Sequence, residues 1–167
     1  MRVLTDGTAV PSSPILASGQ PAKRLVVVVG YDGAEASQRA LAQACELLRS
    51  RESSLEIVYV AQCPALARLS SDALLEMQRA LDDHVQDLAA DLRRRLHGIN
   101  HSWHFQRREG PVASQLSAVC NALKRQFGDS ADVVLVVGGP SHWYHHLAGS
   151  VAATIARQDR CPLVVVP

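Results

Sequence analysis

The sequence has no excess of charge of either sign. Among its 167 residues, 17 are basic and 16 are acidic, which leaves a net charge of +1. Proteins that bind nucleic acid or an anionic membrane surface usually carry a basic patch or an excess of positive charge. We therefore expect neither nucleic acid nor a membrane surface among the partners of this protein.

Long apolar stretches are missing as well. No run of residues approaches the 18 consecutive apolar residues that would indicate a transmembrane helix. The N-terminus also lacks the charged start and long apolar run of a signal peptide. Both absences lead us to expect a cytoplasmic protein without a membrane span.

Paired cysteine motifs and metal-binding motifs are absent too. The four cysteines (Cys45, Cys63, Cys120 and Cys161) form no CxxC and fall on separate predicted elements. We interpret them as free thiols, in preference to disulfides or zinc ligands. Three histidines have the i, i+3, i+4 spacing of metal ligands on a helix, but they fall in a predicted loop without a fourth ligand: His142, His145 and His146. The expectation is no metal site.

The usual nucleotide-binding signatures of α/β proteins are also missing. No GxGxxG follows the first predicted strand, and the sequence contains no GxxxxGK[ST], which excludes the common dinucleotide and P-loop motifs. A receiver domain would need an acidic pair after the first strand, where Asp32 stands alone. A flavodoxin-type phosphate loop would be rich in hydroxyl groups, and the segment GYDGAEAS offers only Ser37. No nucleophile, base and orienting group can be assembled, so we predict no catalytic residues and a protein that is not an enzyme.

The chain divides into a tail and one domain. Residues 1–22 are rich in Pro, Ser and Gly, which interrupt any periodicity, and we predict a flexible N-terminal tail there. Residues 23–167 form a single predicted domain in which strands and helices alternate. The predicted strands are Leu25–Val29, Leu55–Ala61, His101–Arg108, Val133–Val137 and Leu163–Val166. The predicted helices are Ala34–Arg49, Ser71–His97, Pro111–Phe127 and Ser150–Arg157.

This alternation predicts an α/β fold of three layers, with a parallel sheet of five strands covered by helices on both faces. The first strand, LVVVV, is a continuous β-branched run of the kind that is buried on both sides. Ligands of such sheets bind at the carboxyl ends of the strands, where the strand order switches. We place that switch between the first and fourth strands, so the loops to inspect are Gly30–Ala34 and Gly138–Gly149.

Three segments resemble the universal stress protein family. RLVVVVGYDGAEASQRAL (Arg24–Leu41) is similar to the family's opening strand, its following Asp and the Ser of the first helix. REGPVASQL (Arg108–Leu116) resembles the Gly before the third helix. ADVVLVVGG and GSVAATIARQDRCPLVVVP, both within Ala131–Pro167, resemble the closing strand, loop, helix and strand. Each segment alone is only moderately specific for the family. The three segments in this order, from about Lys23 to the C-terminus, make the resemblance a strong one.

The resemblance implies the strand order 3-2-1-4-5 and a homodimer, often paired through the last strand, here Leu163–Val166. It also implies ATP or another adenine nucleotide as the ligand. In ATP-binding members an Asp equivalent to Asp32 contacts the nucleotide, the adenine lies near the end of the second strand, and the phosphates lie on a loop of pattern G-x2-G-x9-G-[ST]. The implied nucleotide-binding residues are Asp32, Val60, Gly138, Gly139, Ser141, Gly149, Ser150 and Val151.

The phosphate loop departs from the family pattern. Gly138, Gly149 and Ser150 match it, but Ser141 stands at the position of the middle Gly. Ten residues separate Gly138 from Gly149 where the pattern has 12, which removes up to about 7 Å of reach. Pro140 removes one N–H donor, and bulky residues replace small ones. The helix N-terminus that would bind an anion is retained, while the part that would wrap the phosphates is shorter.

Two functions therefore stay open. One is a cytoplasmic regulator that binds ATP or another adenine nucleotide through the shortened loop. The other is a dimeric stress adaptor that binds no nucleotide and acts through protein partners. In some members the family resemblance implies at most weak ATP hydrolysis or autophosphorylation. Asp32 itself has two compatible roles, because an Asp at this position also caps the helix that follows.

Overall fold

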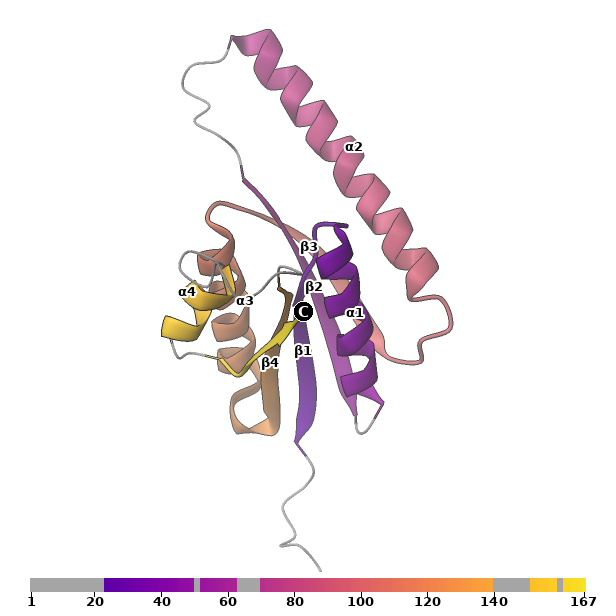
Figure 1. Ribbon diagram of the computed structural model, residues 1–167, viewed down its shortest axis with the longest axis vertical. Coiled ribbons are helices and arrows are strands. Elements are labelled where there is room, and N and C mark those ends of the chain that lie inside the picture. The colour runs from indigo at the N-terminus through magenta and orange to yellow at the C-terminus, as the bar shows by residue number, and fades with distance from the viewer. Residues whose placement is uncertain (1–22, 50–51, 63–69, 140–150, 159–160) are drawn as a thin grey trace, which may run out of the picture.

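The computed structural model describes residues 23–49, 52–62, 70–139, 151–158 and 161–167. The predicted tail over residues 1–22 lies outside this part of the chain. The elements alternate as the sequence predicted (Figure 1). The strands are β1 (Arg24–Gly30), β2 (Ser53–Ala61), β3 (Ser102–Glu109), β4 (Ala131–Gly138) and β5 (Leu163–Val166). The helices are α1 (Glu35–Leu48), α2 (Ser71–Arg95), α3 (Val112–Phe127) and α4 (Val151–Gln158), with a short 3-10 turn, η2 (Gly128–Ser130).

The five strands form one parallel sheet in the order β3-β2-β1-β4-β5, which confirms the predicted fold and strand order. β1 lies at the centre, with Val28 opposite Glu56 of β2 on one side and Leu135 of β4 on the other. The chain leaves β1 toward β2 and later returns to β4 on the other side of β1. The switch in strand order is therefore at the carboxyl ends of β1 and β4, as predicted.

Alternate residues of β1 belong to two different cores. Val27 and Val29 pack with α1 and α2, whereas Val26 and Val28 pack with α3 and α4. All four valines are 0% exposed. Each face of the sheet thus carries its own helical layer, which is the arrangement that a β-branched strand without polar side chains requires.

The boundaries differ from the predicted ones at several ends. β2 begins at Ser53, two residues before the predicted Leu55, because the polar Ser53 is buried and satisfied there: its Oγ donates to the Leu48 carbonyl at 2.9 Å. α2 ends at Arg95, before the predicted His97, and the chain reverses at Gly98, whose φ is +85°. Such a positive φ favours glycine at the end of a helix.

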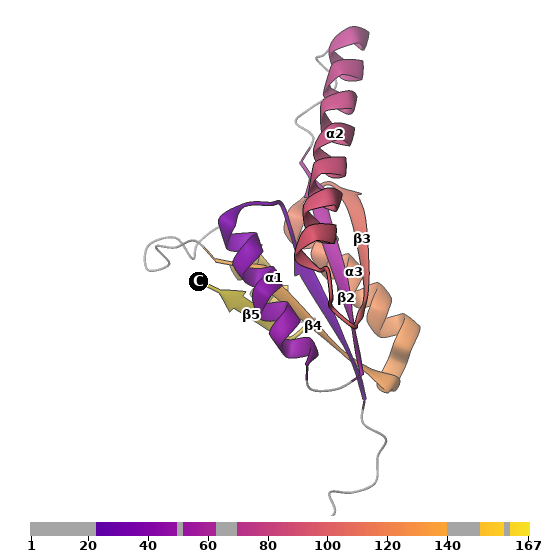
Figure 2. The ribbon, with the colours of Figure 1, turned by 90° about the vertical axis from the view of Figure 1, so that its right-hand side faces the viewer.

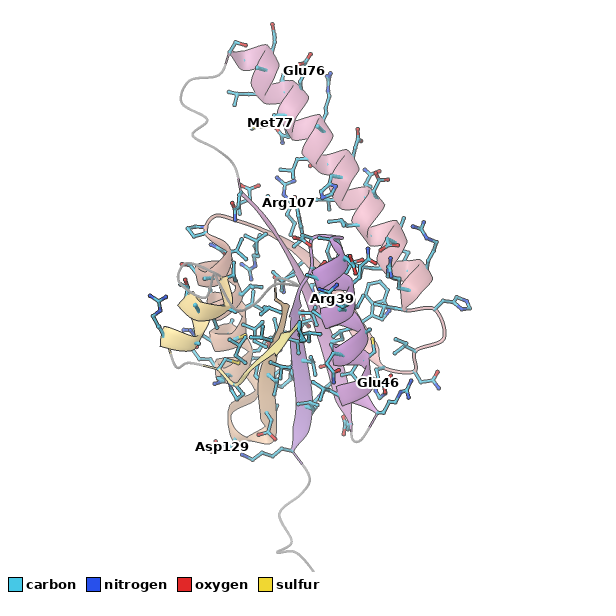
Figure 3. The ribbon with its side chains drawn as sticks, in the orientation of Figure 1. Arg39, Glu46, Glu76, Met77, Arg107 and Asp129 are labelled. Atoms are coloured by element: carbon cyan, nitrogen blue, oxygen red, sulfur yellow. The ribbon has the colours of Figure 1, made fainter. Side chains whose placement is uncertain are left out.

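Helix α2 extends well beyond the sheet (Figures 1 and 2). Its buried residues, Leu88 and Leu92, lie in the C-terminal half. The N-terminal half carries Leu75, which is 53% exposed, and Figure 3 shows Glu76 and Met77 in this protruding part. An ion pair of 2.8 Å between Arg107 of β3 and Asp82 joins the middle of the helix to the edge of the sheet.

Across the described residues, every helix is either too short or too polar to cross a membrane.

The two-sided core predicts a large contrast between two leucine truncations. Leu135→Ala removes a side chain that is 0% exposed in β4, and we expect it to lower the free energy of unfolding by about 2–5 kcal/mol. Leu75→Ala, the matched control on α2, should change it by no more than about 0.5 kcal/mol. Urea unfolding followed by circular dichroism measures both. Equal losses would contradict this placement of the core.

Candidate functional site

A cavity of about 460 Å³ lies at the carboxyl ends of β1, β2 and β4. This is the switch point of the strand order, and the volume lies within the range of small-molecule sites. Its walls are part apolar and part polar, and the polar groups come from the strand ends and from α1 and α2. The lining residues are Gly30, Tyr31, Asp32, Ala36, Ser37, Val58, Tyr59, Val60, Gln62, His84, Val112, Leu116, Val137, Gly138 and Val151.

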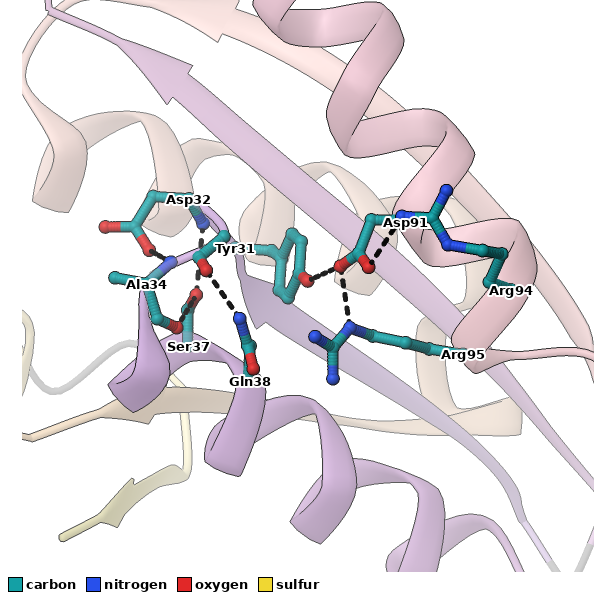
Figure 4. Close-up of polar contacts among 9 residues, drawn as sticks. Tyr31, Asp32, Ala34, Ser37, Gln38, Asp91, Arg94 and Arg95 are labelled. Atoms are coloured by element: carbon teal, nitrogen blue, oxygen red, sulfur yellow. Dashed lines mark hydrogen bonds and ion pairs between the residues drawn. The ribbon is translucent and has the colours of Figure 1, made fainter.

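The loop between β1 and α1 is fixed by its own polar groups (Figure 4). Asp32 Oδ1 accepts a hydrogen bond of 2.9 Å from the Ala34 N–H, and Ser37 Oγ accepts one of 3.3 Å from the Asp32 N–H. Gln38 Nε2 donates to the Gly33 carbonyl at 2.7 Å. The carboxylate of Asp32 is exposed at the cavity. Asp32 therefore holds the turn before α1, and within the described residues its Oδ2 atom makes no hydrogen bond. The prediction that Asp32 caps α1 is wrong, because the N-cap is Ala34 and no side chain bonds to the first N–H groups of the helix.

Tyr31 ties this loop to α2. Its hydroxyl donates a hydrogen bond of 2.6 Å to Asp91 Oδ2, and Asp91 also accepts from Arg94 and Arg95 (Figure 4). Burial, helped by the bond to Asp91, raises the pKa of Tyr31 to about 12. The Tyr31 hydroxyl and the Arg95 guanidinium hold the pKa of Asp91 below its usual value. The buried phenol is thus held neutral beside an ionised carboxylate.

Two glycines let backbone segments approach closely at the site. A Cβ on Gly138 would lie 2.3 Å from the Ala36 carbonyl oxygen, so β4 can end against the first turn of α1 only with glycine at this position. Gly33 has φ of +82°, and a Cβ there would lie 2.8 Å from Leu88 Cδ2. The first glycine of the predicted phosphate loop therefore has a structural role of its own.

Gly139, which follows Gly138 directly, contacts a different neighbour. The Gly139 N–H donates to the Val166 carbonyl at 2.6 Å and so continues the pairing of β4 with β5. Gly139 lies beside the cavity without lining it. The predicted residues Ser141, Gly149 and Ser150 lie outside the described residues, as do Cys63, His142, His145 and His146.

Among the predicted nucleotide-binding residues, the structure brings Asp32, Val60, Gly138 and Val151 to the same cavity. Asp32 comes from the end of β1, Val60 from β2, Gly138 from β4 and Val151 from the start of α4. Residues that span positions 32 to 151 of the sequence are thus gathered, because parallel strands all end at one edge of the sheet.

Sequence reasoning missed Tyr31 and His84. His84 lies on α2 and contacts Tyr59 edge to face, with 5.4 Å between the ring centroids. Nothing in the segment LDDHVQD marks His84, since its place depends on how α2 lies across the sheet. Tyr31 had a usable signal: a tyrosine directly after a buried strand, in a loop already selected for inspection, needs a partner for its hydroxyl.

Few ionisable side chains line the cavity. Asp32 and His84 are its ionisable lining residues besides the tyrosines, and no Lys or Arg of the described chain lines it. An anionic group would depend on backbone N–H donors and the start of α4. The described residues also hold no group of three or more His, Cys, Asp or Glu side chains placed to bind a metal ion.

The sequence matches the model of one protein family. The universal stress protein family model matches residues 24–167, which is most of the chain. No curated protein matches the sequence.

Solved structures of that family have the same fold. The universal stress protein UspA from Lactobacillus plantarum is 16% identical, with a TM-score of 0.65 over 88% of this chain and 100% of the other. A universal stress protein in complex with cAMP is 23% identical, with a TM-score of 0.60 over 86% and 97%. An Arabidopsis thaliana family protein with AMP bound is 16% identical, with a TM-score of 0.53 over 86% and 90%.

Replacing Tyr31 tests how the loop is tied to α2. At neutral pH we expect Tyr31→Phe to lower the free energy of unfolding by about 1.5–3 kcal/mol, because a hydrogen bond to a charged group is lost. A raised pKa means that the contribution of Tyr31 is complete below pH 10 and is lost as the pH rises from 10 toward about 12. The difference between the two proteins should therefore shrink over that interval, as measured by urea unfolding at several pH values.

Asp91→Asn provides the comparison for this experiment. Its amide oxygen can still accept from Tyr31, so the loss at neutral pH should be smaller than that of an Asp91→Ala variant. A difference between wild type and Tyr31→Phe that stays constant from pH 8 to pH 11 would contradict the assignment.

Proposed function

The chain belongs to the universal stress protein family, and on this premise we propose that it is a regulatory protein that binds an adenine nucleotide. The observation that carries the proposal is the cavity of about 460 Å³ at the switch point, which combines apolar walls with the exposed carboxylate of Asp32. Two relatives of the same fold have cAMP or AMP in their structures, and these supply the ligand class.

The cavity offers a distinct place for each part of a nucleotide. Val60 of β2 and Val112 of α3 provide apolar surface for the base. In this proposal Asp32 Oδ2 accepts from ribose hydroxyls or from the amino group of the base, while Oδ1 continues to hold the loop. The phosphate would lie between Gly138 and the start of α4 at Val151, where N–H groups at a helix N-terminus favour an anion.

The shortened loop bears on the number of phosphates. It has 10 residues between Gly138 and Gly149, and no Lys or Arg lines the described cavity. Each further phosphate adds negative charge that these groups would have to balance. We therefore propose a preference for AMP or cAMP over ATP, with binding and regulation as the role of the site in place of catalysis.

Calorimetric titration with AMP, cAMP and ATP tests the proposal. We expect binding to wild type and a loss of about 10- to 100-fold in affinity for Asp32→Ala, which corresponds to removal of a hydrogen bond to a charged group. Asp32→Asn keeps an oxygen acceptor for the Ala34 N–H. It should therefore keep the melting temperature of wild type while binding more weakly, which separates ligand contact from the role of Asp32 in the turn before α1.

Asp129→Ala is the matched control. Asp129 is exposed in η2, just before β4 begins and so at the opposite end of the sheet from the cavity, and its removal should leave affinity unchanged. No heat of binding with any of the three nucleotides would overturn the proposal and favour the dimeric adaptor. Equal affinity of wild type and Asp32→Ala would place the nucleotide elsewhere.

We also propose that two copies pair through β5. This strand is an edge of the sheet, and all four of its residues are apolar and only half-buried. Leu135 N–H donates to the Pro162 carbonyl and Gly139 N–H to the Val166 carbonyl. By the alternation of parallel pairing, the backbone groups of Leu163 and Val165 point away from β4. An apolar edge with free N–H and C=O groups is a template for a further strand.

Proline substitution tests this edge. Val165→Pro removes an outward N–H and should convert a dimer to a monomer with the fold retained, because proline is tolerated on an edge strand. Val164→Pro is the control, since it removes an N–H directed at β4 and should destabilise the protein itself. Light scattering coupled to size-exclusion chromatography gives the mass. A monomeric wild type, or a dimer that survives Val165→Pro, would contradict pairing through β5.

A further inference from the structure

The amide of Gln62, the residue directly after β2, lines the cavity without a hydrogen bond to any described residue. We propose that Gln62 is a specificity-determining residue that selects adenine, by pairing with the 6-amino group of the base and with a ring nitrogen beside it. The inference rests on the proposed nucleotide function and deepens it, because it names the side chain that recognises the base.

Gln62 lies at the boundary between two cavities. It lines the cavity of about 460 Å³ and also a second cavity of about 520 Å³ beside α3 and α4. Val112 of α3 lines both cavities too, and Val112 and Val60 provide the apolar surface to which we assign the base. The amide is therefore beside the proposed place of the base.

The strand before Gln62 directs its side chain to this side of the sheet. Val60 packs in the core under α3 and α4, whereas Tyr59 packs in the opposite core. Because side chains alternate between the two faces along a strand, position 62 continues the side of Val60. The Gly110 N–H donates to the Ala61 carbonyl at 3.1 Å, which fixes the backbone next to the amide.

Among the polar side chains of the described lining, only the amide carries a donor and an acceptor side by side. The Tyr31 hydroxyl and Ser37 Oγ already donate in hydrogen bonds of 2.6 and 2.8 Å. The carboxylate of Asp32 only accepts. His84 packs edge to face on Tyr59, and its two ring nitrogens are not adjacent. The amide is thus the lining group that can form two parallel hydrogen bonds with the edge of a base.

Adenine presents the matching pair of groups. Its 6-amino group donates, and the ring nitrogens on either side of that group accept. The amide oxygen of Gln62 accepts from the amino group while Nε2 donates to a ring nitrogen, which is the bidentate pairing that glutamine makes with adenine in DNA. With the amino group held in this way, Asp32 Oδ2 is left for the ribose hydroxyls.

Calorimetric titration of the full-length protein with AMP and with purine riboside 5′-monophosphate tests this pairing, because the two ligands differ only in the 6-amino group. Wild type should bind AMP about 5- to 20-fold more tightly than the analogue, the lower part of the range for a bidentate pair. Gln62→Leu should bind AMP more weakly than wild type does and should bind the two ligands about equally. A merely structural change would weaken both ligands alike and keep their ratio.

Gln78→Leu is the matched control. Gln78 is exposed on α2 and does not line the cavity, so its loss should leave both affinities unchanged. Gln62 is exposed as well, and Gln62→Leu should keep the melting temperature of wild type, as followed by circular dichroism.

Two results would overturn the inference and leave the proposed function standing. One is a wild type that binds AMP no more tightly than purine riboside 5′-monophosphate. The other is a folded Gln62→Leu variant that keeps the wild-type preference for AMP. A wild type that binds neither ligand would overturn this inference together with the proposed AMP site.

Discussion

Burial of β1 on both faces is the constraint on which the rest of the structure depends. A strand of four valines has no face that can be left in water, so a helical layer must cover each side. To build both layers, the chain first adds β2 and β3 along one edge of β1 and then returns to add β4 and β5 along the other edge. The strand order therefore switches between β1 and β4, and no connection between strands covers the strand ends there. The cavity therefore follows from the hydrophobic pattern of one strand.

The shape of that cavity is then set by backbone contacts. At Gly138 the end of β4 lies so close to Ala36 that a methyl group would overlap the carbonyl oxygen. At Gly33 the turn after β1 fits beneath Leu88 of α2. A glycine in a phosphate-loop pattern is usually explained by close contact between the backbone and the phosphate. Here the packing of α1 on β4 already requires Gly138. A Gly138 variant could lose ligand binding because its fold is disturbed, so the two effects could not be separated. Asp32 is the better residue to substitute when testing the site.

Much of this could be predicted from sequence because it depends on local patterns. Valine runs indicated β1 and β4, a leucine spacing of three or four indicated α2, and the resemblance to the universal stress proteins indicated Asp32. What could not be predicted depends on how helices lie across the sheet. His84 and Asp91 reach the site only because α2 crosses near the end of β1. The start of β2 was missed because Ser53 is polar, and its burial makes sense only once the Leu48 carbonyl is beside it.

The positions of two cysteines also could not be predicted from the sequence. Cys120 and Cys161 fall on separate elements with no motif between them, which in the sequence favoured independent thiols. In the fold both belong to the same hydrophobic cluster, on the face of the sheet that α3 and α4 cover. Tyr31 and Asp91, which are also remote in sequence, form a hydrogen bond on the opposite face, between the turn after β1 and α2. The Tyr31 hydrogen bond lies beside the cavity, whereas Cys161 lies at the amino end of β5, away from it. A change at Asp91 therefore acts on the position of α2 relative to the site without altering a residue that lines the cavity.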